Sequence, residues 1–156
     1  MNTCLPHHLS RSAKIALSWL AVAVMAAAIF WMSANSGESI NSGLGIISAI
    51  KGMLAAGTQW IFGHEVDVSP VGHFTEYLVF GALLFNALRF HLNPRTALLA
   101  ALAIGSLYGT TDEWHQLFVP SRSCDPADWA VDTVATLVGS ALTRFGFRKT
   151  KTPNDK

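Results

Sequence analysis

The most informative shortage in this sequence is a shortage of charge. Only 13% of its 156 residues are Asp, Glu, Lys or Arg, about half of the roughly 25% found in soluble domains. Long stretches carry no charge, and in water they would expose more apolar surface than soluble monomers tolerate. A net charge of +1 also gives no basic surface of the kind that binds nucleic acid. The composition therefore predicts a membrane protein and no nucleic-acid partner.

Cysteine and the common catalytic motifs are scarce as well. Cys4 and Cys124 form no CxxC pattern, and two thiols are too few for a disulfide framework. Neither GxSxG nor HExxH occurs in the chain, so no known nucleophile or zinc spacing is present. We therefore expect two incidental thiols, no cofactor and no metal ion.

Four runs with few or no charges have about the length needed to cross a bilayer. The first, residues 15–34, is longer than the apolar region of a signal peptide, so we interpret it as a retained helix. The others are residues 71–90, 96–111 and 129–147. No repeat or linker divides the chain. The sequence predicts an all-α membrane protein, a bundle of four transmembrane helices forming a single domain over residues 1–156.

The basic residues set the orientation of these spans. Residues 43–63 are also apolar, but they contain Lys51 and several glycines. With four spans and the N-terminus inside, nine of the eleven Lys and Arg are cytoplasmic, whereas a fifth span would move Arg89 and Arg95 outside. We therefore predict four spans in the bacterial cytoplasmic (inner) membrane and cytoplasmic N- and C-termini. Residues 43–63 are expected to form an interfacial helix on the outer face.

Ionisable residues gather where three spans reach the outer leaflet. His73, Glu76 and Tyr77 share one face of the second span, and a carboxylate at the depth of Glu76 costs on the order of 3 kcal/mol unless it is paired, protonated or hydrated. If the third helix continues through residue 116, Asp112 and Gln116 share a face and Glu113 points about 100° away. The residues predicted to form a ligand-binding site are His73, Glu76, Tyr77, Asp112, Glu113, Gln116, Arg122, Asp128 and Asp132.

Three motifs in this order resemble the VanZ-like family. They are His73-Phe-Thr-Glu76-Tyr77, then Asp112-Glu113-Trp-His-Gln116-Leu-Phe-Val-Pro120-Ser-Arg122, then Asp128-x3-Asp132-Thr. The family usually has Gly where this chain has Ser121, and often has a basic residue before the histidine, so Arg122 is left as the candidate cation. The resemblance implies an integral protein of the cell envelope linked to glycopeptide susceptibility, and it implies no defined reaction.

Three functions fit this pattern. We favour a polar site, open to the outer leaflet, that binds a lipid-linked or amphiphilic ligand, because acids in a low-dielectric cleft attract cations and Arg122 can orient an anion. The alternatives are an intramembrane hydrolase or transferase using His73 with Glu76 or Asp112, and a small proton-coupled transporter. Buried polar residues also hold helices together without further function. The sequence leaves open whether the protein is an enzyme and what its oligomeric state is.

Overall fold

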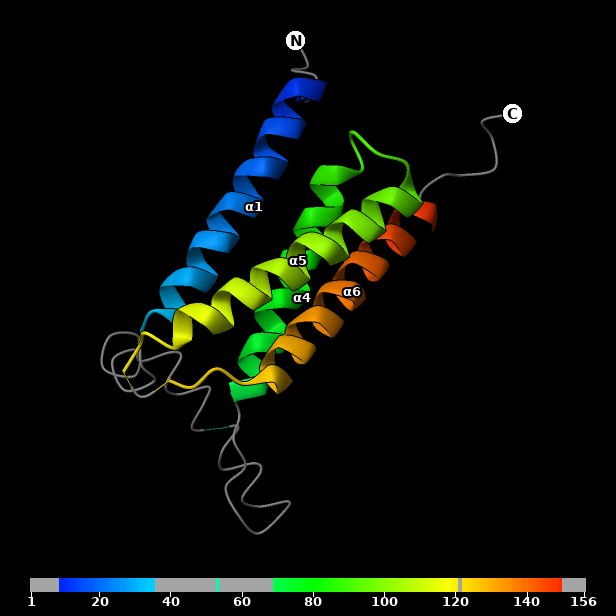
Figure 1. Ribbon diagram of the computed structural model, residues 1–156. Coiled ribbons are helices and arrows are strands. Elements are labelled where there is room, and N and C mark those ends of the chain that lie inside the picture. Colours follow the sequence, from blue (N-terminus) through cyan, green and yellow to red (C-terminus); the bar gives the residue numbers. More distant parts are fainter. Residues whose placement is uncertain (1–8, 36–52, 54–68, 121, 150–156) are drawn as a thin grey trace, which may run out of the picture.

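Four α-helices occupy the part of the chain that the computed structural model describes, which is residues 9–35, 53, 69–120 and 122–149 (Figure 1). They are α1 (Arg11–Ser33), α4 (Ser69–Leu88), α5 (Pro94–Gln116) and α6 (Pro126–Lys149). No strand occurs among these residues. The expected all-α bundle of four helices is confirmed. Apart from residue 53, the predicted interfacial segment 43–63 lies outside the described residues.

Each of three helices begins at a residue that the sequence marks as a start. Ser10 and Asn93 accept hydrogen bonds from backbone N–H groups of the first turns of α1 and α5. Asp125 does the same at α6, where Pro126 is the first helical residue. These caps satisfy N–H groups that have no partner within a helix. The helices therefore extend past the apolar runs into polar flanks, and α5 continues through Gln116 rather than ending near Thr111.

Two of the helices are long and apolar enough to cross a membrane, α1 (Arg11–Ser33) and the segment Pro70–Leu88 of α4. The outward surface of α1 supports this interpretation, since large apolar side chains such as Leu17, Leu20 and Val24 are exposed on it. These helices are therefore suited to a membrane protein.

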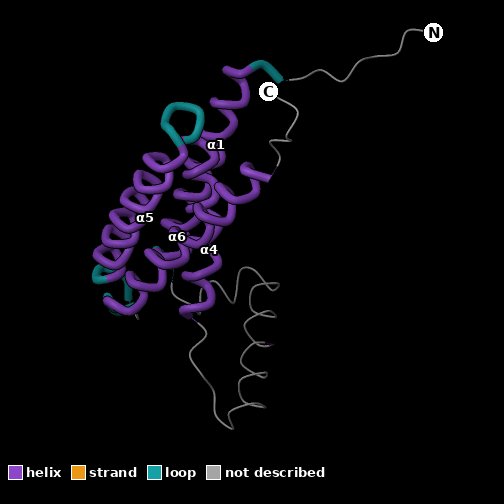
Figure 2. The backbone as a smooth tube through the Cα atoms, turned by 90° about the vertical axis from the view of Figure 1, so that its right-hand side faces the viewer, coloured by secondary structure: helices purple, strands orange, loops and turns teal. Residues whose placement is uncertain are grey.

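Two glycines bring α4 and α6 into backbone contact. A Cβ atom at Gly81 would overlap the backbone carbonyl oxygen of Thr136, and one at Gly139 would overlap that of Leu78. The Ser140 hydroxyl donates to the Gly81 carbonyl at 2.9 Å. Glycine allows this approach because it has no side chain. α6 also packs on α5, and α1 lies mainly against α4 (Figures 1 and 2).

Successive helices run in opposite directions, so the bundle has two chemically different ends (Figure 1). At the basic end lie the start of α1, the end of α4, the start of α5 and the end of α6. That end carries Arg11, Lys14, Arg89, Arg95, Arg144 and Arg148. At the acidic end, the first turns of α4 and α6 meet the last turns of α1 and α5. The predicted site residues on these helices lie at the acidic end.

Candidate functional site

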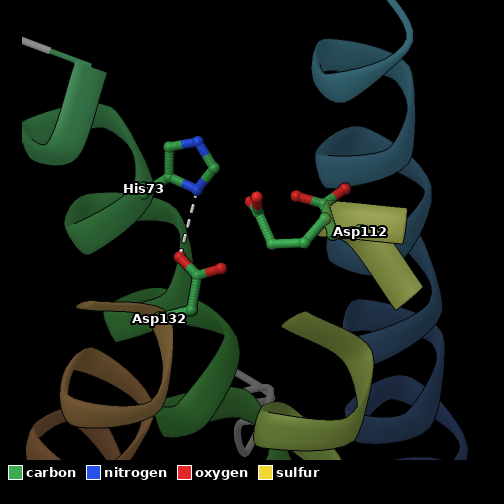
Figure 3. A group of neighbouring side chains, drawn as sticks. His73, Asp112 and Asp132 are labelled. Atoms are coloured by element: carbon green, nitrogen blue, oxygen red, sulfur yellow. Dashed lines mark hydrogen bonds and ion pairs between the residues drawn. The ribbon is translucent and has the colours of Figure 1, made fainter. Parts of the chain in front are cut away.

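A histidine on α4 and an aspartate on α6 form the centre of the acidic end (Figure 3). His73 Nδ1 lies 3.1 Å from Asp132 Oδ1. His73 is 8% exposed and Asp132 is completely buried. The other ring nitrogen, Nε2, lies 3.9 Å from Asp128 Oδ2, one helical turn earlier on α6. The imidazole therefore has a carboxylate next to each nitrogen.

The end of α5 brings two more acids to the same place. Asp112 and Glu113 are buried although they are adjacent in sequence. Glu113 accepts hydrogen bonds from the Gln116 amide at 3.1 Å and from the Asp125 backbone N–H at 2.7 Å. Both acids follow the third apolar run and lie in the last turns of α5. Burial makes their ionised forms costly unless a positive charge lies nearby.

The rotation of α5 explains why both acids are buried. Glu113 points about 100° from the face shared by Asp112 and Gln116, yet all three residues are buried. The His115 ring stacks on Phe30 of α1 with centroids 4.6 Å apart. Because α5 contacts both α1 and α6, adjacent residues on opposite sides of its inner face can both be buried.

Four of the predicted residues converge closely. One potential ligand atom from each of His73, Asp112, Glu113 and Asp132 lies within 4.8 Å of the other three. We call these four residues the carboxylate–histidine cluster. Figure 3 shows His73 on α4, Asp112 on α5 and Asp132 on α6 reaching toward one another from three different helices.

The other two predicted site residues of α4 differ in how deeply they are buried beside this cluster. Tyr77 is completely buried, and its ring packs edge-on against Phe80 and beside Tyr108. Its hydroxyl has no hydrogen-bond partner among the described residues. Glu76 is only partly buried and is not one of the four convergent residues. Sharing a helix face with His73 therefore does not give Glu76 the same environment.

Arg122, the candidate cation of the site, contacts the end of α1. Its Nη2 donates to the backbone carbonyl oxygens of Met32 at 3.5 Å and Asn35 at 3.2 Å, and so satisfies acceptors at the end of α1. Within the described residues it forms no ion pair with an acid of the site. Arg122 thus links the loop before α6 to the end of α1 by hydrogen bonds.

Two residues of the site are absent from the sequence-based set. Ser33, at the end of α1, is buried, and its hydroxyl lies beside the Asp112 carboxyl group but outside hydrogen-bond geometry. Gly109 on α5 faces Asp132, since a Cβ there would lie 3.2 Å from Asp132 Oδ2. The Gly105-x3-Gly109 spacing is a visible signal for close helix packing, but it does not reveal which side chain uses the space.

An apolar pocket of about 460 Å³ adjoins the carboxylate–histidine cluster. Glu113 belongs to both, and it is the only acidic residue among those that line the pocket in the described part of the chain. Trp129 is fixed there by a hydrogen bond from its indole N–H to the Ser106 carbonyl at 3.2 Å. The residues lining the pocket are Thr110, Glu113, Trp114, Leu117, Cys124, Pro126 and Trp129.

Comparison with known proteins places this bundle in a family. A family model described as VanZ/LLP1 matches residues 18–147, which include every predicted site residue and most of the four helices. No curated protein and no solved structure matches the chain. The match agrees with the three motifs at the acidic end. The chain therefore belongs to the VanZ/LLP1 family.

Proposed function

We propose that this protein spans the bacterial inner membrane with its four helices and binds an amphiphile at its acidic end. The separation of charge between the two ends supports this topology, because Lys and Arg are enriched on the cytoplasmic side of membrane proteins. The basic end would then face the cytoplasm, and the acidic end would lie beneath the outer surface. Exposed apolar side chains along α1 suit contact with lipid.

The observation that carries the binding proposal is the position of Glu113. Its carboxylate belongs to the buried carboxylate–histidine cluster, and the residue is also one of those that line the apolar pocket. A ligand with an apolar chain and a polar head can fill the pocket with the chain and place the head against Glu113. Few polar groups that fix orientation, set in a largely apolar wall, are typical of small-molecule sites. A lipid-linked precursor of the envelope or a lipid-tailed antibiotic has this chemistry.

Two matched threonines allow a test of the pocket. Thr110 and Thr75 are both exposed helical residues at the acidic end, and the hydroxyl of each donates to the carbonyl four residues earlier. Only Thr110 lines the pocket. Native mass spectrometry of the full chain, released from detergent, should detect a retained amphiphile on wild type and on Thr75→Phe. Thr110→Phe fills the pocket and should lose it. Equal retention by the two variants, or none on wild type, would overturn the proposal.

We extend the proposal to glycopeptide susceptibility, because ligand occupancy at the outer leaflet could change how such antibiotics reach their envelope target. Cells expressing wild type or Thr75→Phe should then share one susceptibility. Thr110→Phe, at equal membrane abundance, should return cells to the susceptibility of the empty host. If cells expressing Thr110→Phe kept the wild-type susceptibility, the change in susceptibility would not depend on the pocket.

A second candidate function is favoured by the His73–Asp132 contact. A histidine oriented by a buried carboxylate is the arrangement of a general base, and here Asp132 holds the position that sequence reasoning assigns to Glu76 or Asp112. The corresponding activity is hydrolysis or group transfer on a membrane-bound substrate. His73→Gln should then leave the retained amphiphile in place but abolish any change in its mass during incubation with membrane lipid extract. Unaltered lipid in the wild-type reaction would rule this candidate out.

A further inference from the structure

We propose that His73, Asp112, Glu113 and Asp132 bind one divalent transition-metal ion, of the zinc or manganese type. The four ligand atoms come from three helices and lie within 4.8 Å of one another. Around a single ion, ligand atoms at bond lengths of about 2.0–2.2 Å are separated by roughly 3–4 Å. The side chains would therefore need to close in by only about 1 Å to share an ion.

The charge of the cluster calls for a cation. Three carboxylates and one imidazole are buried together. Within the described residues, the ion pairs of these groups involve only His73 with Asp128 and Asp132, and no Lys or Arg. Arg122, the nearest candidate in the sequence, donates instead to the end of α1. Buried charges are normally paired or coordinate metals. Among the described residues only the imidazole of His73 could offset the three carboxylates, and by one charge at most, so a divalent ion would supply the remaining positive charge.

An unsatisfied atom points independently to a missing partner. Asp132 is completely buried, yet its Oδ2 has no hydrogen bond among the described residues. Figure 3 shows this oxygen directed toward Asp112 rather than toward His73. A buried polar atom without a partner in a native protein requires an explanation, and a bound ion provides one.

Neighbouring groups already hold two of the four ligands in place. Asp128 lies beside His73 Nε2, the nitrogen that faces away from Asp132. Ligating histidines usually donate their other N–H to a carboxylate or carbonyl, which orients the ring. Glu113 is held by the Gln116 amide and the Asp125 N–H, and each of its oxygens retains a lone pair. His73 and Glu113 are thus positioned before any ion binds.

Three carboxylates and one imidazole nitrogen restrict which metal ions fit the site. Carboxylates suit magnesium, calcium and manganese, whereas an imidazole nitrogen suits zinc, iron, copper and nickel, so a mixed set of both favours a transition metal over magnesium or calcium. The site has no signature in the sequence, because its ligands lie on α4, α5 and α6 and have no fixed local spacing. An ion here would also give a head group in the adjoining pocket an anionic preference, such as phosphate or carboxylate, although the metal proposal does not depend on that ligand.

Elemental analysis of the full chain in detergent tests the proposal. Protein stripped with a chelator and then dialysed against zinc or manganese should retain about one ion per chain, and its thermal unfolding temperature should rise. Asp112→Asn and Asp132→Asn should each weaken binding by more than about tenfold. Glu76→Gln is the matched control, because Glu76 is a neighbouring acid outside the four.

Wild-type protein decides the question even if a variant fails to fold. Retention of much less than one ion per chain by folded wild type, with no shift in unfolding temperature, would overturn the proposal. An equal loss of metal in Glu76→Gln and Asp112→Asn would also overturn the proposal. Such a result would mean that the ion binds non-specifically to negative charge, whichever acid carries it. Stoichiometric binding lost only in the cluster variants supports the site.

Discussion

His73 on α4 and Asp132 on α6 face each other with 3.1 Å between Nδ1 and Oδ1. They are 59 residues apart in sequence and both buried. The same two helices meet without intervening side chains at Gly81 and Gly139. The histidine–aspartate contact is therefore built on the closest helix pair of the bundle, which fixes both of its side chains.

This contact predicts an energetic coupling. In chelator-washed protein, unfolding of wild type, His73→Gln, Asp132→Asn and the double variant should give a double-mutant cycle with a coupling of about 1–3 kcal/mol. The comparison cycle of His73 with Asp128, 3.9 Å from Nε2, should give less. Single-variant effects that add to within about 0.5 kcal/mol would show that the two residues do not interact.

Gly139→Ala should destabilise the bundle. The added Cβ meets the Leu78 backbone carbonyl, which cannot rotate away as a side chain can, and overpacking of this kind costs about 1–3 kcal/mol. At Gly146, on the same helix, an added Cβ would have nothing within 4 Å of it. Gly146→Ala should instead be neutral or stabilise by up to about 1 kcal/mol through helix propensity. Thermal unfolding in detergent measures both, and a stable Gly139→Ala protein would contradict the packing.

Replacement of tyrosine by phenylalanine should affect stability at one of two tyrosines and not at the other. The Tyr108 hydroxyl donates to the Ala26 carbonyl at 2.7 Å and so joins α5 to α1. Tyr108→Phe should lower stability by about 1 kcal/mol. The Tyr77 hydroxyl is buried without a partner among the described residues, so in metal-free protein Tyr77→Phe should cost nothing. Equal losses in the two variants would mean that the Tyr77 hydroxyl has a partner after all.

The proposed topology predicts which thiols react from outside the cell. Cys124 is exposed and lines the pocket at the acidic end. With Cys4 replaced by Ser, it should react with a membrane-impermeant maleimide in cells whose outer membrane has been permeabilised. Arg148→Cys, in a chain without Cys4 and Cys124, lies at the basic end and should react only after lysis. Labelling of both positions from the same side would reject the four-span arrangement.

The helices can be predicted from the sequence because each apolar run is long and its flanks carry recognisable caps such as Asn93 and Asp125. The sequence also identifies the acidic end, since His73, Asp112 and Asp132 lie in or directly beside long apolar runs, where ionisable residues are unusual. The family resemblance from the same residues is confirmed by the VanZ/LLP1 match.

The contacts within the site cannot be predicted from the sequence because they depend on the rotation of each helix about its axis. Spacing places Glu113 and Glu76 in the predicted site alike, yet Glu113 is buried in the cluster and Glu76 is only partly buried. Spacing also does not show that Arg122 donates to the end of α1, a contact that only the folded chain defines. Spacing along one helix predicts a shared face, and it does not predict which neighbouring helix that face meets.

The glycine contacts between α4 and α6 also limit how this molecule can change shape. Neither helix can slide along the other without forcing side chains into a backbone, so the pair moves as a single rigid piece that carries His73 and Asp132. α1 buries few of its residues, so we expect any opening of the bundle to begin with a movement of α1. Such a movement would leave the histidine–aspartate pair in place.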